Sequence, residues 1–210
     1  MIPLDSLLIF ASTSLLLALT TGPDNLFVLS QSALFGRRAG VMITLGLCTG
    51  LIVHTGAVAL GAAAIFQTSE SAFTALQLAG AGYLSYLAWH SFCAAAQQPL
   101  TGATAALIAS ARYRRGIVMN LTNPKVSLFF LSFLPQFTSP QYGPVAPQIM
   151  VLGGVFMVSA LSVFVTIATL AGTLSHWWSR SQRAQIALHR IAGLIFIALA
   201  VHLIVSDHAV

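Results

Sequence analysis

Two ionisable residues, Asp24 and Lys125, lie inside hydrophobic segments of the sequence, and each directly follows a proline. The stretches that contain them read Gly22-Pro23-Asp24-Asn25 and Asn120-Leu121-Thr122-Asn123-Pro124-Lys125. A proline inside a helix removes a backbone hydrogen bond, and freed backbone groups at membrane depth are tolerated only where protein or a wet cavity satisfies them. A charge near the bilayer centre is also costly, so residues of this kind indicate a functional site.

The chemistry of the two breaks suits a zwitterion. The half-helix that starts after each break presents free N–H groups and a positive dipole end, which favour an anionic group such as a carboxylate. Lys125 would strengthen that anion site, whereas Asp24 suits an ammonium group or a proton. We therefore predict a substrate-binding or coupling site, with its helix breaks at Gly22, Pro23 and Pro124, formed by Asp24, Asn25, Lys125, Asn120 and Asn123.

Two alternatives stay open for these charged and titratable groups. Asp24 and Lys125 could instead form a structural ion pair that holds two kinked helices together, although the net stabilisation by such buried pairs is often small. His54, inside another hydrophobic segment, is a candidate proton relay. A hydrogen-bonded packing histidine is the commoner reading of such a residue.

The composition is that of a membrane protein. Hydrophobic residues make up 57% of the chain and charged residues 6%, against about 25% charged residues in soluble domains. The apolar residues form six blocks long enough to cross a bilayer, at roughly Leu4–Leu34, Gly40–Phe66, Ala72–Ala96, Gly116–Phe137, Val145–Leu174 and Ala187–Ser206. The N-terminus lacks a basic region and an Ala-x-Ala-like cleavage site, so we expect the first block to be retained as a span.

The arginines predict the orientation of these spans. They cluster in or beside the connections between spans one and two, three and four, and five and six, as Arg37, Arg38, Arg112, Arg114, Arg115, Arg180, Arg183 and Arg190. The other connections carry no Lys or Arg. Under the positive-inside rule the arginine-rich connections are cytoplasmic, which places both termini outside. The basic charge is therefore a topology signal and does not indicate nucleic-acid binding.

The spans divide into two halves around a polar stretch. We predict one transmembrane domain over residues 1–210, with repeat one at about 1–96, a cytoplasmic connection at about 97–115 and repeat two at about 116–210. Because each half has three spans, the second copy enters from the opposite side, as in the inverted repeats of secondary transporters. The fold class is thus an all-α integral membrane protein whose first and fourth helices are broken.

The depth of both breaks follows from the chain length to the nearest arginines. Pro23 precedes Arg37 by 14 residues, and Pro124 follows Arg114 by 10. At about 1.5 Å per residue these lengths correspond to roughly 15–20 Å from the cytoplasmic boundary. The midplane of a hydrocarbon core about 30 Å thick lies near 15 Å. Both breaks are therefore expected near the middle of the membrane.

Other sequence features indicate packing. The spacing Gly46-x-x-x-Gly50, continued by Gly56 and Gly61, allows close helix approach. A helical stripe of phenylalanines follows Lys125, and lipid contact or packing is its expected role: Phe129, Phe130, Phe133 and Phe137. The prolines between Pro135 and Pro147 predict an extended, non-helical external connection.

Several classes of site are not predicted. No His, Cys or acidic cluster has the spacing of metal ligands, and no catalytic triad, zinc-protease or phosphate-loop motif occurs. We therefore expect no metal, no cofactor and no enzymatic activity. The expected partners are a small-molecule substrate, protons and the lipid bilayer, and a homo-oligomer is left open.

At the same residues the chain resembles the lysine-exporter (LysE/RhtB) family of amino-acid exporters. The resemblance rests on six stretches that together span nearly the whole chain: residues 21–26, 36–40, 46–50, 80–84, 116–125 and 134–137. It implies export of amino acids or their derivatives across the bacterial inner membrane, driven by the proton gradient. The homoserine/threonine branch is the most similar.

The alternative reading is a cation or metal-ion exporter of a related six-span family. A single carboxylate at membrane depth argues against it, because hard divalent cations usually take several oxygen ligands. A membrane-embedded enzyme or an accessory scaffold is a further alternative. The missing catalytic clusters argue against an enzyme, and a scaffold would not need charged, broken helices.

Overall fold

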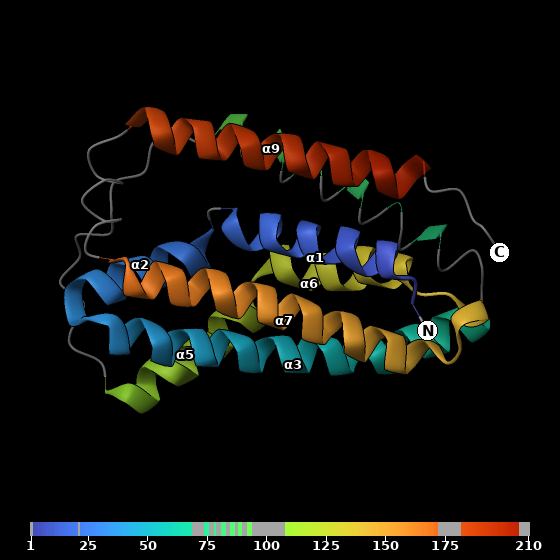
Figure 1. The fold of residues 1–210 in the computed structure, drawn as a ribbon, viewed down its shortest axis with the longest axis horizontal. Helices are drawn as coiled ribbons and strands as arrows, with labels where there is room; N and C mark the ends of the chain where they lie inside the picture. The colour runs from blue at the N-terminus through green and yellow to red at the C-terminus, as the bar shows by residue number, and fades with distance from the viewer. Residues whose placement is uncertain are drawn as a thin grey trace.

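The computed structural model of the chain describes residues 2–20, 22–68, 108–171 and 182–205, with isolated positions between 74 and 93. Within these ranges every regular element is helical, which confirms the all-α fold class. The longer helices run along a common direction (Figure 1). In this part of the chain, two helices are long and apolar enough to cross a membrane, or up to four spans are possible if each bent pair counts as one.

The first span is interrupted where the sequence predicts a break. Helix α1, Leu4–Leu19, and helix α2, Pro23–Phe35, meet at an angle of 58°. Pro23 occupies the first position of α2, where its missing N–H costs no helical hydrogen bond. The predicted first block, Leu4–Leu34, thus corresponds to the two helices together.

The second break has the same design. Helix α5, Ala109–Leu121, ends before Asn123, and α6, Pro124–Leu128, starts with the second proline. The chain continues as a π-helical segment η1, Phe129–Phe133, and a 3-10 turn η2, Leu134–Phe137. The two arms are bent by 50°. The helix begins at Ala109, earlier than the predicted Gly116, because the arginine-rich turns are helical as well.

The remaining helices are α3, Arg37–Thr68, α7, Val145–Thr169, and α9, Gln182–Val205. These overlap the predicted second, fifth and sixth blocks. The predicted third block, Ala72–Ala96, lies mostly outside the described residues. The count of six spans and the inverted repeat therefore stay predictions.

The proline-rich connection before α7 differs from the extended loop that we predicted. It contains η2 and a second 3-10 turn, η3, Pro140–Tyr142. Proline fits the first position of such turns because no N–H is needed there. The side chain of Gln148 holds the connection in place: its amide nitrogen donates to Ser139 O at 2.9 Å and Gly143 O at 2.8 Å, and its oxygen accepts from Ser139 N at 3.1 Å.

Helices α3 and α5 approach each other closely through glycine. A Cβ atom at Gly46 would collide with the backbone oxygen of Tyr113, and one at Gly50 would collide with the Asn120 side chain. The Thr49 and Tyr113 hydroxyls bond across the same contact at 2.8 Å. The predicted packing role is confirmed for Gly46 and Gly50. No described atom lies within 4 Å of a Cβ placed at Gly56 or Gly61, so the tight contact does not extend to them.

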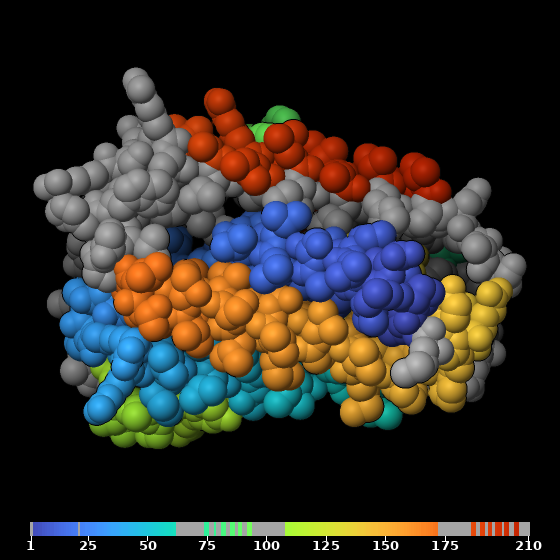
Figure 2. Space-filling model, viewed as in Figure 1, coloured from blue at the N-terminus to red at the C-terminus, as the bar shows by residue number. Residues whose placement is uncertain are grey.

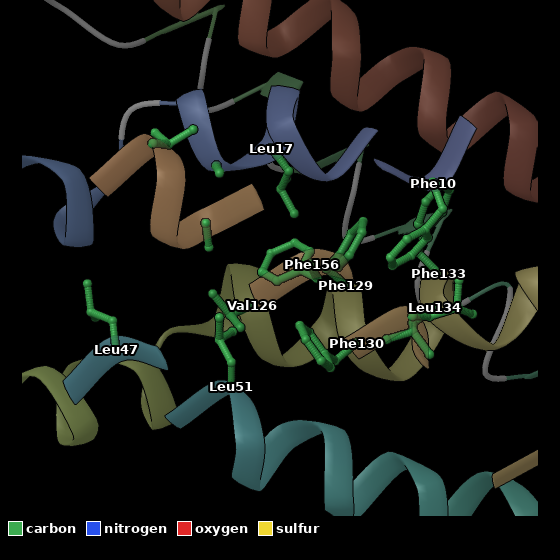
Figure 3. Packing of buried hydrophobic residues seen from close by; sticks show 14 of the residues in the cluster. Phe10, Leu17, Leu47, Leu51, Val126, Phe129, Phe130, Phe133, Leu134 and Phe156 are labelled. Atoms are coloured by element: carbon green, nitrogen blue, oxygen red, sulfur yellow. The ribbon is translucent and has the colours of Figure 1, made fainter. Parts of the chain in front are cut away.

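The core is rich in phenylalanine (Figure 3). Phe129 lies between Phe133 and Phe156, with ring centroids at 4.9 and 5.2 Å, and Phe10 of α1 packs against Phe137 at 5.1 Å. Phe129, Phe130 and Phe133 are fully buried, so packing, not lipid contact, is their role. The aromatic stripe thus joins the arm after the second break to α1 and α7.

Large apolar side chains also cover the outside of the described helices. Figure 2 shows α1, α7 and α3 side by side on one face. Exposed residues on these helices include Leu8, Ile9, Leu60, Met150 and Val158. Apolar surface of this extent suits contact with lipid tails.

Candidate functional site

The two breaks meet inside the protein through Asp24 and Asn123. The side-chain amide of Asn123 donates to Asp24 Oδ2 at 2.8 Å, although the residues are 99 positions apart. Both side chains are buried, with exposed fractions of 2% and 3%. The contact joins the first turn of α2 to the residue that precedes α6. The sequence-predicted residues Asp24 and Asn123 therefore lie together.

Asn123 also fixes the start of α6. Its side-chain oxygen accepts from the backbone N–H of Lys125 at 3.0 Å, which is the capping bond of that helix. Because one end of the amide is held by Lys125 N, the other end points at Asp24. The amide orientation is thus set by contacts at both ends.

The ammonium group of Lys125 lies at the C-terminal end of α1. It donates to Thr20 O at 3.1 Å and to Leu17 O at 3.4 Å. Both carbonyls lie at the end of α1, where the last backbone oxygens of a helix need donors from outside it, and a cation is favoured at the negative end of a helix dipole. Gly22 leaves room for this contact: a Cβ atom at Gly22 would lie 3.2 Å from Lys125 Nζ.

Asn25 satisfies a third carbonyl of the same helix end. Its side-chain nitrogen donates to Ala18 O at 2.8 Å. Lys125 and Asn25 therefore close the end of α1 together, one from each half of the chain. Sequence reasoning named both side chains but missed their partners, because the backbone oxygens of Leu17 and Ala18 leave no signal in the residue types.

Asp24 and Lys125 are not hydrogen-bonded to each other. The ammonium group donates to carbonyls, and the carboxylate accepts from Asn123. Within the part of the chain that the structure describes, Asp24 Oδ1 and Asn25 Oδ1 are buried without a hydrogen-bond partner. Both free atoms are acceptors, so a group that donates several hydrogen bonds, such as an ammonium, would satisfy them.

Asn120 and His54 lie at the contact between α3 and α5. The Asn120 side chain faces Gly50, and its backbone oxygen accepts from Asn123 N at 3.1 Å. His54 Nε2 lies 3.4 Å from the same oxygen, and its ring is 5.7 Å from that of Phe130. Both residues are thus linked to Asp24 through Asn123, which binds Asn120 O with its backbone and Asp24 with its side chain. Among the described residues, no group of three or more His, Cys, Asp or Glu side chains could hold a metal ion.

Two broken helices that bring an acid and a base together among apolar helices define a membrane protein with a polar site at helix breaks. Residues 15–207 match the family described as LysE type translocator. The chain belongs to this family, which confirms the resemblance seen in its motifs, and it is a membrane transporter.

Named relatives cover nearly the whole chain. A homoserine/homoserine lactone efflux protein of Salmonella typhimurium is 32% identical over 197 residues, which are 94% of this chain and 95% of the relative. A leucine efflux protein of Salmonella choleraesuis is 25% identical over 194 residues, which are 90% of each chain. No solved structure matches the chain.

Proposed function

We propose that the protein exports small amino acids or their derivatives across the bacterial inner membrane, in exchange for protons. The family and the efflux proteins among its relatives support the transport class and an amino-acid substrate. The observation that carries the proposal is the buried Asp24 carboxylate, which has one free oxygen and lies where the two breaks meet.

In this proposal the substrate ammonium binds the free acceptors Asp24 Oδ1 and Asn25 Oδ1. The substrate carboxylate then takes the Lys125 ammonium, which leaves the carbonyls at the end of α1. The Leu17 and Thr20 carbonyls lose the Lys125 donor in that exchange, so water that enters with the substrate takes its place at the helix end. Each half of the chain thus supplies one charged side chain that pairs with the substrate: Asp24 binds its ammonium and Lys125 its carboxylate.

Proton coupling follows from competition at Asp24. A carboxylate that holds a proton no longer attracts an ammonium, so proton and substrate bind one at a time. Alternating access would then exchange an outward-moving amino acid for an inward-moving proton. His54 is the second candidate for carrying the proton, because it contacts the same break through Asn120 O.

The topology proposal completes this scheme. We assign six spans in two inverted repeats, with both termini extracytoplasmic, on the placement of the arginines and the two proline breaks. In that orientation α2 and α5 occupy the cytoplasmic half of the membrane, because both adjoin the arginine-rich connections.

The test is uptake of labelled homoserine, threonine, leucine and lysine into inverted membrane vesicles, with an acidic lumen or with no pH gradient. An exporter fills such vesicles, and proton exchange makes filling depend on the gradient. Uptake of at least one amino acid above that of vesicles without the protein is expected. If none of the amino acids is taken up, the transport proposal is contradicted. If uptake is equal with and without the pH gradient, proton coupling is contradicted.

A further inference from the structure

Helix α2 and the second broken helix meet along a seam of three side-chain contacts. Asp24 accepts from Asn123, Phe27 lies under Arg115, and Phe35 lies under Arg112. The partners run in opposite order along the two segments, so α2 and α5 are antiparallel. The two arginine contacts thus extend from the Asp24 site along α2 toward its C-terminal end at Phe35.

The guanidinium groups of both arginines lie over phenyl rings of α2. In each pair the guanidinium carbon lies 5.0 Å from the centre of the phenyl ring. A guanidinium stacked on a ring leaves its planar edge of N–H donors free for a bidentate acceptor. Among the described residues neither arginine has an acidic partner, and Arg112 Nε is buried with no hydrogen bond at all.

Arg112 Nε lacks an acceptor, and the edge of a guanidinium group fits an acceptor with two oxygens. A buried donor without a partner loses the hydrogen bonds that it made to water, which favours a ligand that restores them. Asp24, the acid of α2, contacts Asn123 at the other end of the seam and forms no ion pair with either arginine among the described residues. A carboxylate matches the geometry of the guanidinium edge, and every amino acid carries one.

We propose that Arg112 and Arg115 form a capture site for the carboxylate of the transported amino acid, at the cytoplasmic mouth of the α2–α5 seam. Phe27 and Asp24 lie three residues apart in α2, about one helical turn, so Arg115 is the nearer of the two to the Asp24 site. The amino acid first binds the arginines by its carboxylate and then passes its ammonium to Asp24. This proposal rests on the proposed export of amino acids.

The chain offers a matched control on the same helix turn. Arg114 is exposed, as Arg115 is, but it lies over no ring within the described residues. The variants R112K with R115K, and R114K alone, all keep the positive charge that sets the topology. Lysine lacks the planar fork, so only the double variant loses the proposed site.

Transport kinetics in inverted vesicles test the site with two probes, an amino acid that the wild type exports and its methyl ester. For the double variant, KM for the amino acid is expected to rise about tenfold, the loss of roughly one charged hydrogen bond, with little change in the maximal rate. KM for the ester, which lacks the carboxylate, is expected to be the same in the double variant as in the wild type. R114K behaves as the wild type with both probes.

Other outcomes would overturn the carboxylate site. An equal KM change for the amino acid and its ester would assign the arginines to a gate that is blind to the carboxylate. An unchanged KM would leave them without a substrate role. A rise that vanishes in vesicles without anionic lipid would identify the missing anion as a lipid headgroup.

A binding measurement separates this proposal from transport. Thermal unfolding of the purified protein in detergent is followed with leucine, homoserine or their methyl esters. The site is supported if the amino acid stabilises the wild type and R114K but not the double variant R112K with R115K, and if the ester stabilises none of them. This result supports the site even if vesicles show no export. Stabilisation equal in all three proteins, or none in any, contradicts it.

Discussion

Asn123 donates its side-chain amide to Asp24 at 2.8 Å and caps α6 with the oxygen of the same amide. One side chain therefore orients the acid of the first break and begins the helix of the second. Asp24 and Lys125, the two charges that the sequence marks as a pair, are connected through it. The breaks are linked because Asn123 belongs to the second and contacts Asp24 of the first.

Replacement of Asn123 tests this bridge. In Asn123→Ala the carboxylate loses its donor and α6 loses its cap, so we expect the free energy of unfolding to fall by about 1–3 kcal/mol. Export should fall as well. Thr122→Ala is the control, because the Thr122 hydroxyl is exposed and bonds within its own helix, so its effect should be under about 0.5 kcal/mol. Equal effects of the two variants on thermal unfolding in detergent would contradict the bridge.

Lys125→Ala should reduce export strongly while the amount of protein in the membrane stays near normal. Removal of an intramembrane charge eases insertion, whereas the substrate loses its cationic partner. Export per molecule is measured by vesicle uptake divided by the protein level on an immunoblot. Loss of the protein itself, with export per molecule unchanged, would instead favour a purely structural role for the ammonium at the end of α1.

Glycine variants of α3 test the close contact with α5. Gly46→Ala places a methyl group against the Tyr113 backbone oxygen, so α3 and α5 must separate, at a cost of about 1–3 kcal/mol. Gly56→Ala on the same helix meets no described atom and should be neutral or stabilising, by up to about 1 kcal/mol. Thermal unfolding of both purified variants measures the difference. The reverse ranking would mean that the helices are not held together at Gly46.

The helix breaks could be predicted because their causes are local. Pro23 and Pro124 each remove a backbone donor wherever they stand, so the sequence alone places the start of α2 and of α6. Charges in apolar surroundings are equally visible, which is why Asp24 and Lys125 were found. These features need no knowledge of which helices pack together.

The partners of these residues could not be predicted, because they depend on packing. Lys125 binds backbone oxygens of α1, and any apolar residue type offers the same oxygen. Asn120 and Asn123 look equivalent in sequence, yet one faces Gly50 and the other Asp24, because α5 ends between them. The contacts of Arg112 and Arg115 with the phenylalanines of α2 were not predicted for the same reason. No spacing in the sequence indicates which ring an arginine will contact.

The topology proposal makes a direct prediction. Because arginines are expected in the cytoplasm, a reporter fused at Val210 should behave as extracytoplasmic and one inserted near Ala109 as cytoplasmic. Alkaline phosphatase and green fluorescent protein report the two sides. The opposite pattern would overturn the orientation. Both reporters on the same side would overturn the inverted repeat, since an odd number of spans in each half requires the two halves to enter from opposite sides.

Asp24→Asn tests whether proton exchange uses this carboxylate. The amide resembles the protonated acid in shape and charge, so the variant cannot alternate between a proton and a substrate ammonium. Export driven by a pH gradient should therefore be abolished, while exchange of labelled for unlabelled substrate without a gradient can survive if the remaining contacts still bind. Asn123 can keep its bond, because the new side chain still offers an oxygen at the position of Asp24 Oδ2, and the fold should be retained.

Two vesicle assays, one with an acidic lumen and one at equal pH, separate coupling from binding. Gradient-driven export that stays at the wild-type rate would exclude Asp24 as the proton carrier and direct the same pair of assays to His54, which contacts the break from the α3 side.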